Sequence, residues 1–211
     1  MKGVDVSYAN GKLDWLDWGI LKDAGIEFAM CRCTYGKSGI DDTFQSNVNE
    51  ATKSGIKCGA YHYSYALNEY DAIKEAQHCK EVIDNSGVLL ELPVFFDMED
   101  EDRYKKRNGF SFTRYNITNI CKSFLDNFPY NKGVYASASW LDSYIDWKSL
   151  NCPVWNAEWG NRPMSFANTN GNNDSIRAYI WQFTDRLLID GREFDGNILY
   201  DNKDKAGQNG Y

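Results

Sequence analysis

The sequence predicts an α/β fold, an irregular TIM-like barrel of the (β/α)5(β)3 type. Helical spacing of apolar residues alternates with short β-rich runs, in units of about thirty residues, which indicates parallel βαβ units. After the fifth unit only β-rich segments follow, joined by Gly- and Asn-rich loops that leave little room for helices. Because periodicity alone does not close a barrel, a doubly wound open sheet is the alternative architecture.

The expected strands are short runs rich in β-branched and aromatic residues: 3–6, 27–34, 57–64, 92–99, 133–137, 154–158, 178–184 and 187–189. The expected helices place apolar residues on one face: 13–24, 44–51, 72–83 and 117–128, with a fifth, shorter helix at 138–145. Gly25, Gly55, Gly87 and Gly133 follow the four longer helices, where a left-handed glycine commonly caps the helix end.

The chain of 211 residues is 43% hydrophobic, enough to bury a sizeable core, and is most simply one domain. We expect residues 1–201 to form this domain. Residues 202–210 contain Ala206 as their single apolar residue, so we predict that residues 202–211 are a linker or an artificial chain end.

The net charge of −7 argues against a nucleic-acid partner, because such proteins normally present a basic surface to the phosphates. The segment after Met1 has no apolar run long enough for a signal peptide, and no later stretch is long enough to span a bilayer. We therefore expect a chain that binds no nucleic acid, is made without an export signal and does not insert into a membrane.

The six cysteines lack the C-x-x-C spacing of common zinc and redox sites. Several lie in apolar-patterned segments, where a reduced cysteine behaves as a small core residue, so we expect buried free thiols rather than disulfides. His62 and His78 are the only histidines, which argues against a His-rich zinc site, and His62 is expected to be a hydrogen-bonded barrel residue. No metal or other cofactor is expected.

The run from Pro93 to Glu99 carries the strongest catalytic signal. Strand side chains alternate between faces, so Asp97 and Glu99 point the same way, with Cα atoms about 6.5 Å apart. They lie where an apolar strand meets an acidic loop, the active-site end of a parallel barrel. Like charges this close separate the two pKa values, so one group can act as an acid while the other is ionised, as glycosidic cleavage requires. A solvated acidic strand end or a cation site is the alternative.

Two further carboxylates are candidates for the same site. Asp5 follows the short first strand, and Asp195 lies in the polar segment 193–197. If the first and last strands close the barrel side by side, both carboxylates reach the mouth. Taken alone, each is more often a helix cap or turn residue than a catalytic one.

Aromatic residues gather at other expected strand ends, where flat rings suit the apolar faces of sugars and polar groups take the hydroxyls. The candidates for substrate binding are Tyr61, Tyr63, Tyr135, Trp155, Trp159, Trp181 and Gln182. At least about half of the rings are expected to be ordinary core residues, because aromatics dominate protein cores.

An ordered set of segments resembles the Chalaropsis-type lysozymes, glycoside hydrolase family 25. The set runs from about residue 1 to residue 201 and is more specific than any single motif. The matching segments are Gly3-Val4-Asp5-Val6-Ser7, Gly59-Ala60-Tyr61-His62-Tyr63, Phe96-Asp97-Met98-Glu99, Val134-Tyr135-Ala136-Ser137, Val154-Trp155-Asn156-Ala157-Glu158, Trp181-Gln182-Phe183 and Phe194-Asp195-Gly196-Asn197.

The resemblance implies a barrel with five helices and three final strands. It also implies N-acetylmuramidase activity on the β-1,4 bond between N-acetylmuramic acid and N-acetylglucosamine of peptidoglycan glycan strands. By position, Glu99 would be the general acid and Asp97 its partner. Asp5 and Asp195 would be supporting carboxylates, and Glu158 is expected among the substrate contacts.

The same family is common in bacteriophage endolysins. The resemblance therefore implies a C-terminal cell-wall-binding module after the linker, synthesis in the cytoplasm of a bacterial host without a signal peptide, and action on the wall after release. The negative charge is consistent with wall binding by a separate module, because the interaction of the domain itself with a polyanionic wall would be weakly attractive or repulsive.

The stereochemical outcome stays open, because an i, i+2 carboxyl pair can bracket either a retaining or an inverting separation. We favour retention assisted by the 2-acetamido group of the substrate, with Asp97 as stabiliser and the roles of nucleophile or base as its alternatives. The competing functions are a chitinase or other N-acetylhexosaminidase, and a sugar-binding module with a dead active site.

Overall fold

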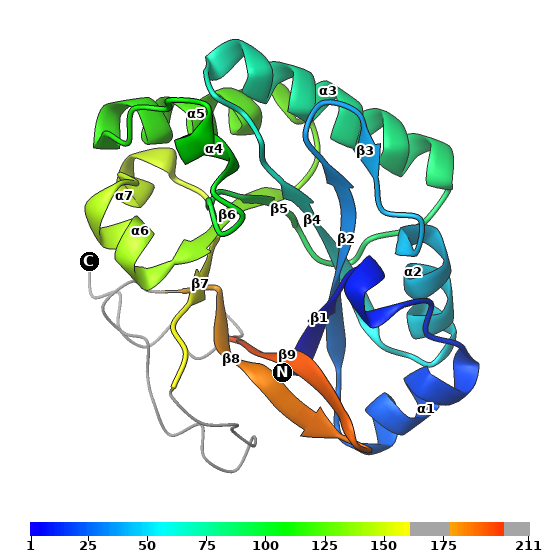
Figure 1. Cartoon of the computed structure of the whole chain (residues 1–211). Coiled ribbons are helices and arrows are strands. Elements are labelled where there is room, and N and C mark those ends of the chain that lie inside the picture. The colour runs from blue at the N-terminus through cyan, green and yellow to red at the C-terminus, as the bar shows by residue number, and fades with distance from the viewer. Residues whose placement is uncertain (161–177, 201–211) are drawn as a thin grey trace, which may run out of the picture.

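The structure is a computed structural model that describes residues 1–160 and 178–200. Within this part of the chain, eight strands close into a barrel, viewed along its axis in Figure 1. They are β1 (Lys2–Val6), β2 (Phe28–Tyr35), β4 (Lys57–Tyr63), β5 (Val94–Asp97), β6 (Lys132–Ser137), β7 (Val154–Ala157), β8 (Ile180–Ile189) and β9 (Arg192–Leu199). Among the described strands, the short β3 (Gly39–Ile40) pairs only with the end of β2. The predicted irregular TIM-like barrel is confirmed, and the open-sheet alternative is wrong.

Helices lie outside the barrel along β2, β4, β5, β6 and β7 (Figure 1). The longer ones are α1 (Trp15–Asp23), α2 (Phe44–Lys53), α3 (Glu69–Ser86), α5 (Arg114–Asn127) and α6 (Ala138–Ser143), and they match the five predicted helices. Three short elements were not expected: the 3-10 helix η1 (Tyr8–Asn10), α4 (Tyr104–Arg107) and α7 (Trp147–Leu150). Side-chain caps fix several helix starts: Asp14 accepts from Leu16 N and Asp17 N, and Asn68 accepts from Asp71 N.

The last third of the barrel differs from the predicted arrangement. Residues 178–184 and 187–189 were expected to be separate strands, but a single strand, β8, continues through irregular pairing around Thr184. The eighth strand is instead β9, which follows a tight turn where Asp190 and Gly191 take positive φ. Because β9 pairs antiparallel with both β8 and β1, it closes the barrel against the direction of the other strands.

Three of the four predicted helix-end glycines, Gly25, Gly55 and Gly87, have positive φ. The prediction for Gly133 is wrong, because this residue lies inside β6. A Cβ there would come within 2.5 Å of the Phe95 ring and of the Pro153 carbonyl oxygen. Gly133 is therefore required by the close approach of a ring that fills the barrel, and not by a helix cap.

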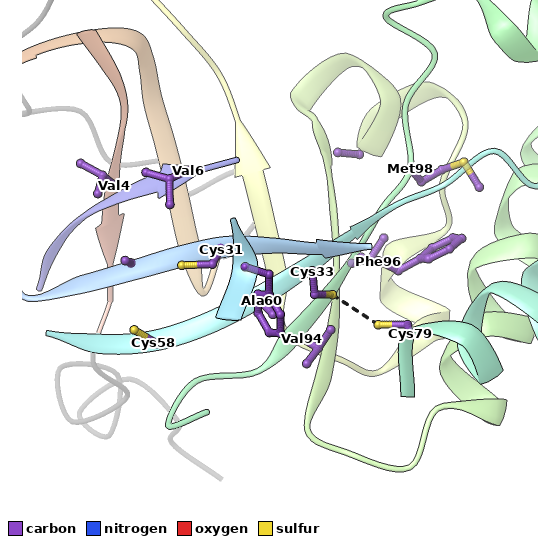
Figure 2. Close-up of a cluster of buried hydrophobic side chains, with 14 of the residues drawn as sticks. Val4, Val6, Cys31, Cys33, Cys58, Ala60, Cys79, Val94, Phe96 and Met98 are labelled. Atoms are coloured by element: carbon purple, nitrogen blue, oxygen red, sulfur yellow. Dashed lines mark hydrogen bonds between the residues drawn. The ribbon is translucent and has the colours of Figure 1, made fainter. Parts of the chain in front are cut away.

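The core has two layers, one on each side of the strands. The outer layer packs the strands against the helices, and Figure 2 shows part of it, including Val4, Val6, Phe96 and Met98. All six cysteines are free and five are buried, which confirms the predicted core positions for those five. Cys33 and Cys79 hold their sulfur atoms 3.5 Å apart (Figure 2). In the described ranges, no helix has the length and apolar character needed to cross a membrane.

The inner layer fills the lower part of the barrel with side chains that include Phe28, Met30, Phe95, Trp155 and Ile180. A TIM-type barrel is packed with side chains and is not a pore, so a substrate site has room only above this layer. The predicted linker at residues 202–211 lies outside the described residues.

Candidate active site

A cavity of about 160 Å³ opens above the packed interior, at the carboxyl ends of the parallel strands. Its lining contains all four carboxyl groups predicted for catalysis and six of the predicted substrate contacts. The lining residues are Asp5, Arg32, Tyr61, Tyr63, Asp97, Glu99, Glu101, Tyr135, Trp155, Trp159, Gln182 and Asp195. The structure thus brings together residues that are up to 190 positions apart, from Asp5 to Asp195.

Asp97 and Glu99 lie on the same side of their segment, as strand alternation predicts. Asp97 is the last residue of β5, and Glu99 follows beyond the strand end. The segment stays paired one residue further, because Met98 N donates to Tyr135 O at 3.0 Å while the Met98 side chain is buried in the outer layer. Glu99 is therefore directed back to the cavity beside Asp97.

Burial raises the pKa of both members of this pair. The pKa of Asp97 is raised well above its ordinary value, first by burial and then by the charge of Glu99, while Lys105 and Arg32 act in the opposite direction. The pKa of Glu99 is raised to about 7, first by burial and then by Glu101. The pKa values of Asp97 and Glu99 are therefore both raised. The sequence had led us to expect an ionised Asp97 beside a protonated Glu99.

One oxygen of Asp97 is available to a ligand. Asp97 Oδ1 is buried and receives no hydrogen bond from any side chain or backbone group in residues 1–160 and 178–200. A buried carboxylate oxygen without a donor is unfavourable, so a donor on a bound molecule would be favoured at this position.

Asp5 is held by two amide side chains. Gln182 Nε2 and Asn197 Nδ2 donate to Asp5 Oδ2 at 2.8 and 2.7 Å. Burial raises the pKa of Asp5, and these two hydrogen bonds oppose the shift by favouring the charged form.

Three rings fix the orientation of those amides. Tyr135 OH and Trp159 Nε1 donate to Gln182 Oε1 at 3.0 and 2.9 Å, which turns Gln182 Nε2 toward Asp5. Trp155 Nε1 donates in the same way to Asn197 Oδ1 at 2.9 Å. Trp155 is only 1% exposed, so it forms part of the cavity floor and has little surface for a sugar ring.

Asp195 faces Asp5 across the closing strand pair, where the two residues are directly opposite in register. Burial, followed by the charge of Asp5, raises the pKa of Asp195 to about 10. Asp5 Oδ2 receives two N–H donors, whereas Asp195 shares one of them only through its backbone oxygen, so the pair is expected to keep a proton on the Asp195 carboxyl at neutral pH.

Two predicted substrate contacts lie outside the cavity lining. The Trp181 side chain packs against Phe183 in the outer layer, and its Nε1 donates to Glu158 O at 3.2 Å. The reason is strand alternation, since Gln182 faces inward and its neighbour must face outward. Glu158 is exposed and lies beside Arg114 in a separate hollow on the helical side.

His62 lies in the buried outer layer, as a hydrogen-bonded barrel residue. His62 Nδ1 and Thr34 Oγ1 are 2.8 Å apart, and His62 Nε2 lies 3.3 Å from Glu75 Oε2. In the described residues, no group of three or more His, Cys, Asp or Glu side chains is arranged to hold a metal ion.

Sequence reasoning missed three polar residues around the site: Arg32, Lys105 and Asn197. Arg32 is part of the cavity lining and comes from the inward face of β2. Asn197 is two residues from Asp195, so the strand rule would have found it if β9 had been recognised. Lys105 lies in a short basic run that carries no signal of burial.

Lys105 is a buried cation directly behind the carboxyl pair. Its Nζ donates to Ser64 O and, at 2.8 Å, to Glu99 O. Ser64 in turn donates from Oγ to Glu75 Oε2 at 2.7 Å and from N to Asp97 O at 3.0 Å. Burial lowers the pKa of Lys105, and Glu75 and Asp97 oppose that shift.

Replacing Lys105 with methionine is expected to lower the free energy of unfolding by about 2–4 kcal/mol. The change leaves two buried carbonyl oxygens without their donor and removes the positive charge beside Glu75 and Asp97. Urea denaturation would measure the difference, with Lys106→Met as the matched control because Lys106 is exposed. Equal stability of the two variants would contradict a structural role for the buried cation.

A closed α/β barrel with paired carboxyls at its mouth is an arrangement that suits a glycoside hydrolase. The chain matches glycosyl hydrolases family 25 over residues 4–192, and it belongs to this family. It is 27% identical over 205 residues to the autolytic lysozyme of Clostridium acetobutylicum, covering 90% of this chain but 58% of that relative. The chain therefore spans less than two thirds of that protein.

Solved structures share the fold. The bacterial lysozyme of Streptomyces coelicolor superposes with a TM-score of 0.73 at 22% identity, covering 95% of this chain and 92% of that one. The autolysin LytC of Streptococcus pneumoniae, solved in complex with a synthetic peptidoglycan ligand, gives a TM-score of 0.78 at 23% identity. That match covers 94% of this chain and 46% of LytC.

Proposed function

We propose that this chain is an N-acetylmuramidase that hydrolyses the β-1,4 bond between N-acetylmuramic acid and N-acetylglucosamine in bacterial peptidoglycan. The observation that carries the proposal is the Asp97 and Glu99 pair in the barrel cavity, where the pKa of Glu99 is raised to about 7. Membership of family 25 and the lysozymes among its relatives support the same reaction.

Glu99 is the proposed general acid, because an ordinary glutamate is ionised at neutral pH and a pKa near 7 keeps a proton available. It would protonate the leaving glycosidic oxygen as the bond to the anomeric carbon breaks. The acidic neighbours Glu101 and Asp102 favour retention of this proton until the substrate arrives.

Asp97 is the proposed stabiliser of a substrate-assisted, retaining reaction. The 2-acetamido oxygen of the muramic acid residue would attack the anomeric carbon and invert it as the protonated leaving oxygen departs. Water would then attack the same carbon from the opposite face, break its bond to the acetamido oxygen and invert it again, so the configuration is retained overall. Asp97 Oδ1, which has no donor in the described chain, would accept the acetamido N–H. This hydrogen bond favours ionised Asp97 and leaves the remaining proton on Glu99. NMR of the first-formed anomer tests the scheme, and an inverted product would exclude it.

The biological setting is proposed from the same family relationship. A wall-binding module is proposed to follow the domain, because the chain of 211 residues carries a net charge of −7 and would be repelled by a polyanionic wall. The enzyme would be made in the cytoplasm of a bacterial host and act on the wall after release. Asp5 and Asp195 are proposed as supporting carboxylates, with Tyr61, Tyr63, Tyr135 and Gln182 as substrate contacts.

Clearing of purified cell walls, followed by mass spectrometry of the products, tests the proposed function. A muramidase releases fragments with reducing N-acetylmuramic acid ends. Reducing N-acetylglucosamine ends, or cleavage of chitin instead of walls, would assign the chain to another N-acetylhexosaminidase. Binding to walls without release of any fragment would support a sugar-binding module and exclude the proposed enzyme.

The pH dependence of kcat/KM should show the raised pKa of Glu99, because this ratio reports the free enzyme. Only the protonated form donates, so kcat/KM is expected to fall about tenfold per pH unit above about pH 7. Glu101→Gln removes the negative charge that raises the pKa of Glu99 most, so it should lower that pKa and move the falling limb to lower pH. A pH titration of both enzymes would measure the shift, and a falling limb near pH 4.5 in the wild type would contradict it.

A further inference from the structure

A second cavity lies beside the catalytic one. It has a volume of about 510 Å³ and is lined by Tyr8 of η1, Tyr35 of β2 and Tyr65 after β4, together with Arg32 and nearby acidic residues. Arg32 lines both cavities. The rings of Tyr63 and Tyr65, one from each cavity, meet edge to face with centroids 5.2 Å apart. The two cavities are therefore neighbours that share a wall.

Arg32 is held in place on this wall. Its Nε donates to Asp41 Oδ2 at 2.9 Å, and the same oxygen accepts from Tyr8 N at 2.9 Å. The other oxygen of Asp41 accepts from Thr43 N at 3.0 Å and from Thr43 Oγ1 at 2.6 Å. Because both oxygens of Asp41 are held by hydrogen bonds, Asp41 fixes the position of Arg32 Nε. The two Nη groups of Arg32 make no hydrogen bond to the described part of the chain.

The tyrosine rings are arranged around this guanidinium. Its central carbon lies 4.6 Å from the Tyr8 ring centroid and 5.4 Å from that of Tyr35. The Tyr35 ring lies against Gly39, where a Cβ would come within 2.2 Å of it. Tyr8 and Tyr35 are nevertheless 63% and 38% exposed. The cavity thus offers fixed ring surfaces next to unused N–H donors.

The charges of this cavity favour a neutral ligand. Asp41 already pairs with Arg32, and Asp42 adds a further negative charge to the lining. An acidic peptide would be repelled, whereas a pyranose presents apolar faces to the rings and hydroxyl or acetamido oxygens to the donors.

We propose that this tyrosine cavity is a glycan subsite that binds one N-acetylhexosamine of the strand, beyond the two sugars that flank the scissile bond. The inference rests on the proposed function, because it identifies further substrate contacts of the same enzyme. The wall shared through Arg32 lets one strand occupy both cavities. Longer glycans should then be cleaved more efficiently than a disaccharide.

The test compares peptide-free peptidoglycan fragments, the disaccharide with one scissile bond against the hexasaccharide. We expect kcat/KM of the wild type to be at least about tenfold higher for the hexasaccharide. The double variant Tyr8→Ala with Tyr35→Ala should lose most of this advantage and cleave the disaccharide as before. Tyr115→Ala, at a 74% exposed tyrosine on α5, is the matched control and should keep the advantage.

An equal loss on both substrates would show that the tyrosines only support the catalytic cavity, and would overturn the subsite. An unchanged advantage in the double variant would overturn it as well. If the wild type cleaves neither fragment, the proposed function fails, and tryptophan fluorescence titration with the hexasaccharide tests the subsite separately. Weaker binding by the double variant than by Tyr115→Ala would then support the subsite, and equal binding would exclude it.

Discussion

Replacing Glu99 with glutamine is expected to reduce the rate of wall lysis by at least about a thousandfold while the barrel stays folded. Glutamine has nearly the same shape, so the cavity keeps its form, but it has no proton to give to the leaving oxygen. The pKa of about 7 makes Glu99 the acid of the pair that can release its proton near neutral pH. Turbidity clearing at pH 6, with circular dichroism as the folding check, would measure the effect.

The matched control for this variant is Glu91→Gln. Glu91 is exposed and precedes the same strand, outside the cavity lining. It should lyse walls like the wild type. Near-normal lysis by Glu99→Gln would remove Glu99 from the proposed mechanism.

Replacing Asp97 with asparagine is expected to lower kcat by about a hundredfold to a thousandfold. An asparagine oxygen can still accept the acetamido N–H, but it carries no negative charge to stabilise the positive charge that develops during attack. Burial already makes the charged form of Asp97 costly, so the variant should unfold at the same or a higher temperature than the wild type. Steady-state kinetics with a thermal melt would show whether activity and stability separate in this way.

Asp126→Asn is the control, because Asp126 is an exposed residue of α5 paired only with Lys122 among the described residues. An Asp97→Asn variant with a normal kcat would rule out the proposed electrostatic role of Asp97. A large fall in melting temperature would instead indicate that Asp97 holds the fold together.

The fold could be predicted where local patterns repeat. Helical spacing located α3 and α5, and Asp97 and Glu99 were placed on one face by the two-residue period of a strand. The prediction failed at β9, where inward polar residues such as Asp195 and Asn197 replace the expected apolar alternation. These residues are polar because this part of β9 faces the cavity and not the packed interior.

The site could be predicted only in part, because several of its properties depend on contacts between distant segments. Lys105 looks like a surface lysine in the sequence, but its Nζ is buried against Ser64 O, which follows β4, and Glu99 O, which follows β5. The raised pKa of Asp97 likewise comes first from burial, which a single segment does not specify. Trp181 was misplaced for a local reason, since adjacent strand residues cannot both face the substrate and Gln182 occupies the inward position.

The closing strand pair also sets the order in which the molecule can be assembled. Met1 N donates to Leu199 O across 198 positions, and the two amides on Asp5 come from residues 177 and 192 positions away. During synthesis from the N-terminus, β1 cannot form its pairing with β9 until nearly the whole domain has been made. Ribosome-bound chains that end before β9 are therefore expected to lack both a closed barrel and the hydrogen bond from Asn197 to Asp5. The enzyme would become competent only when nearly the whole domain has been made.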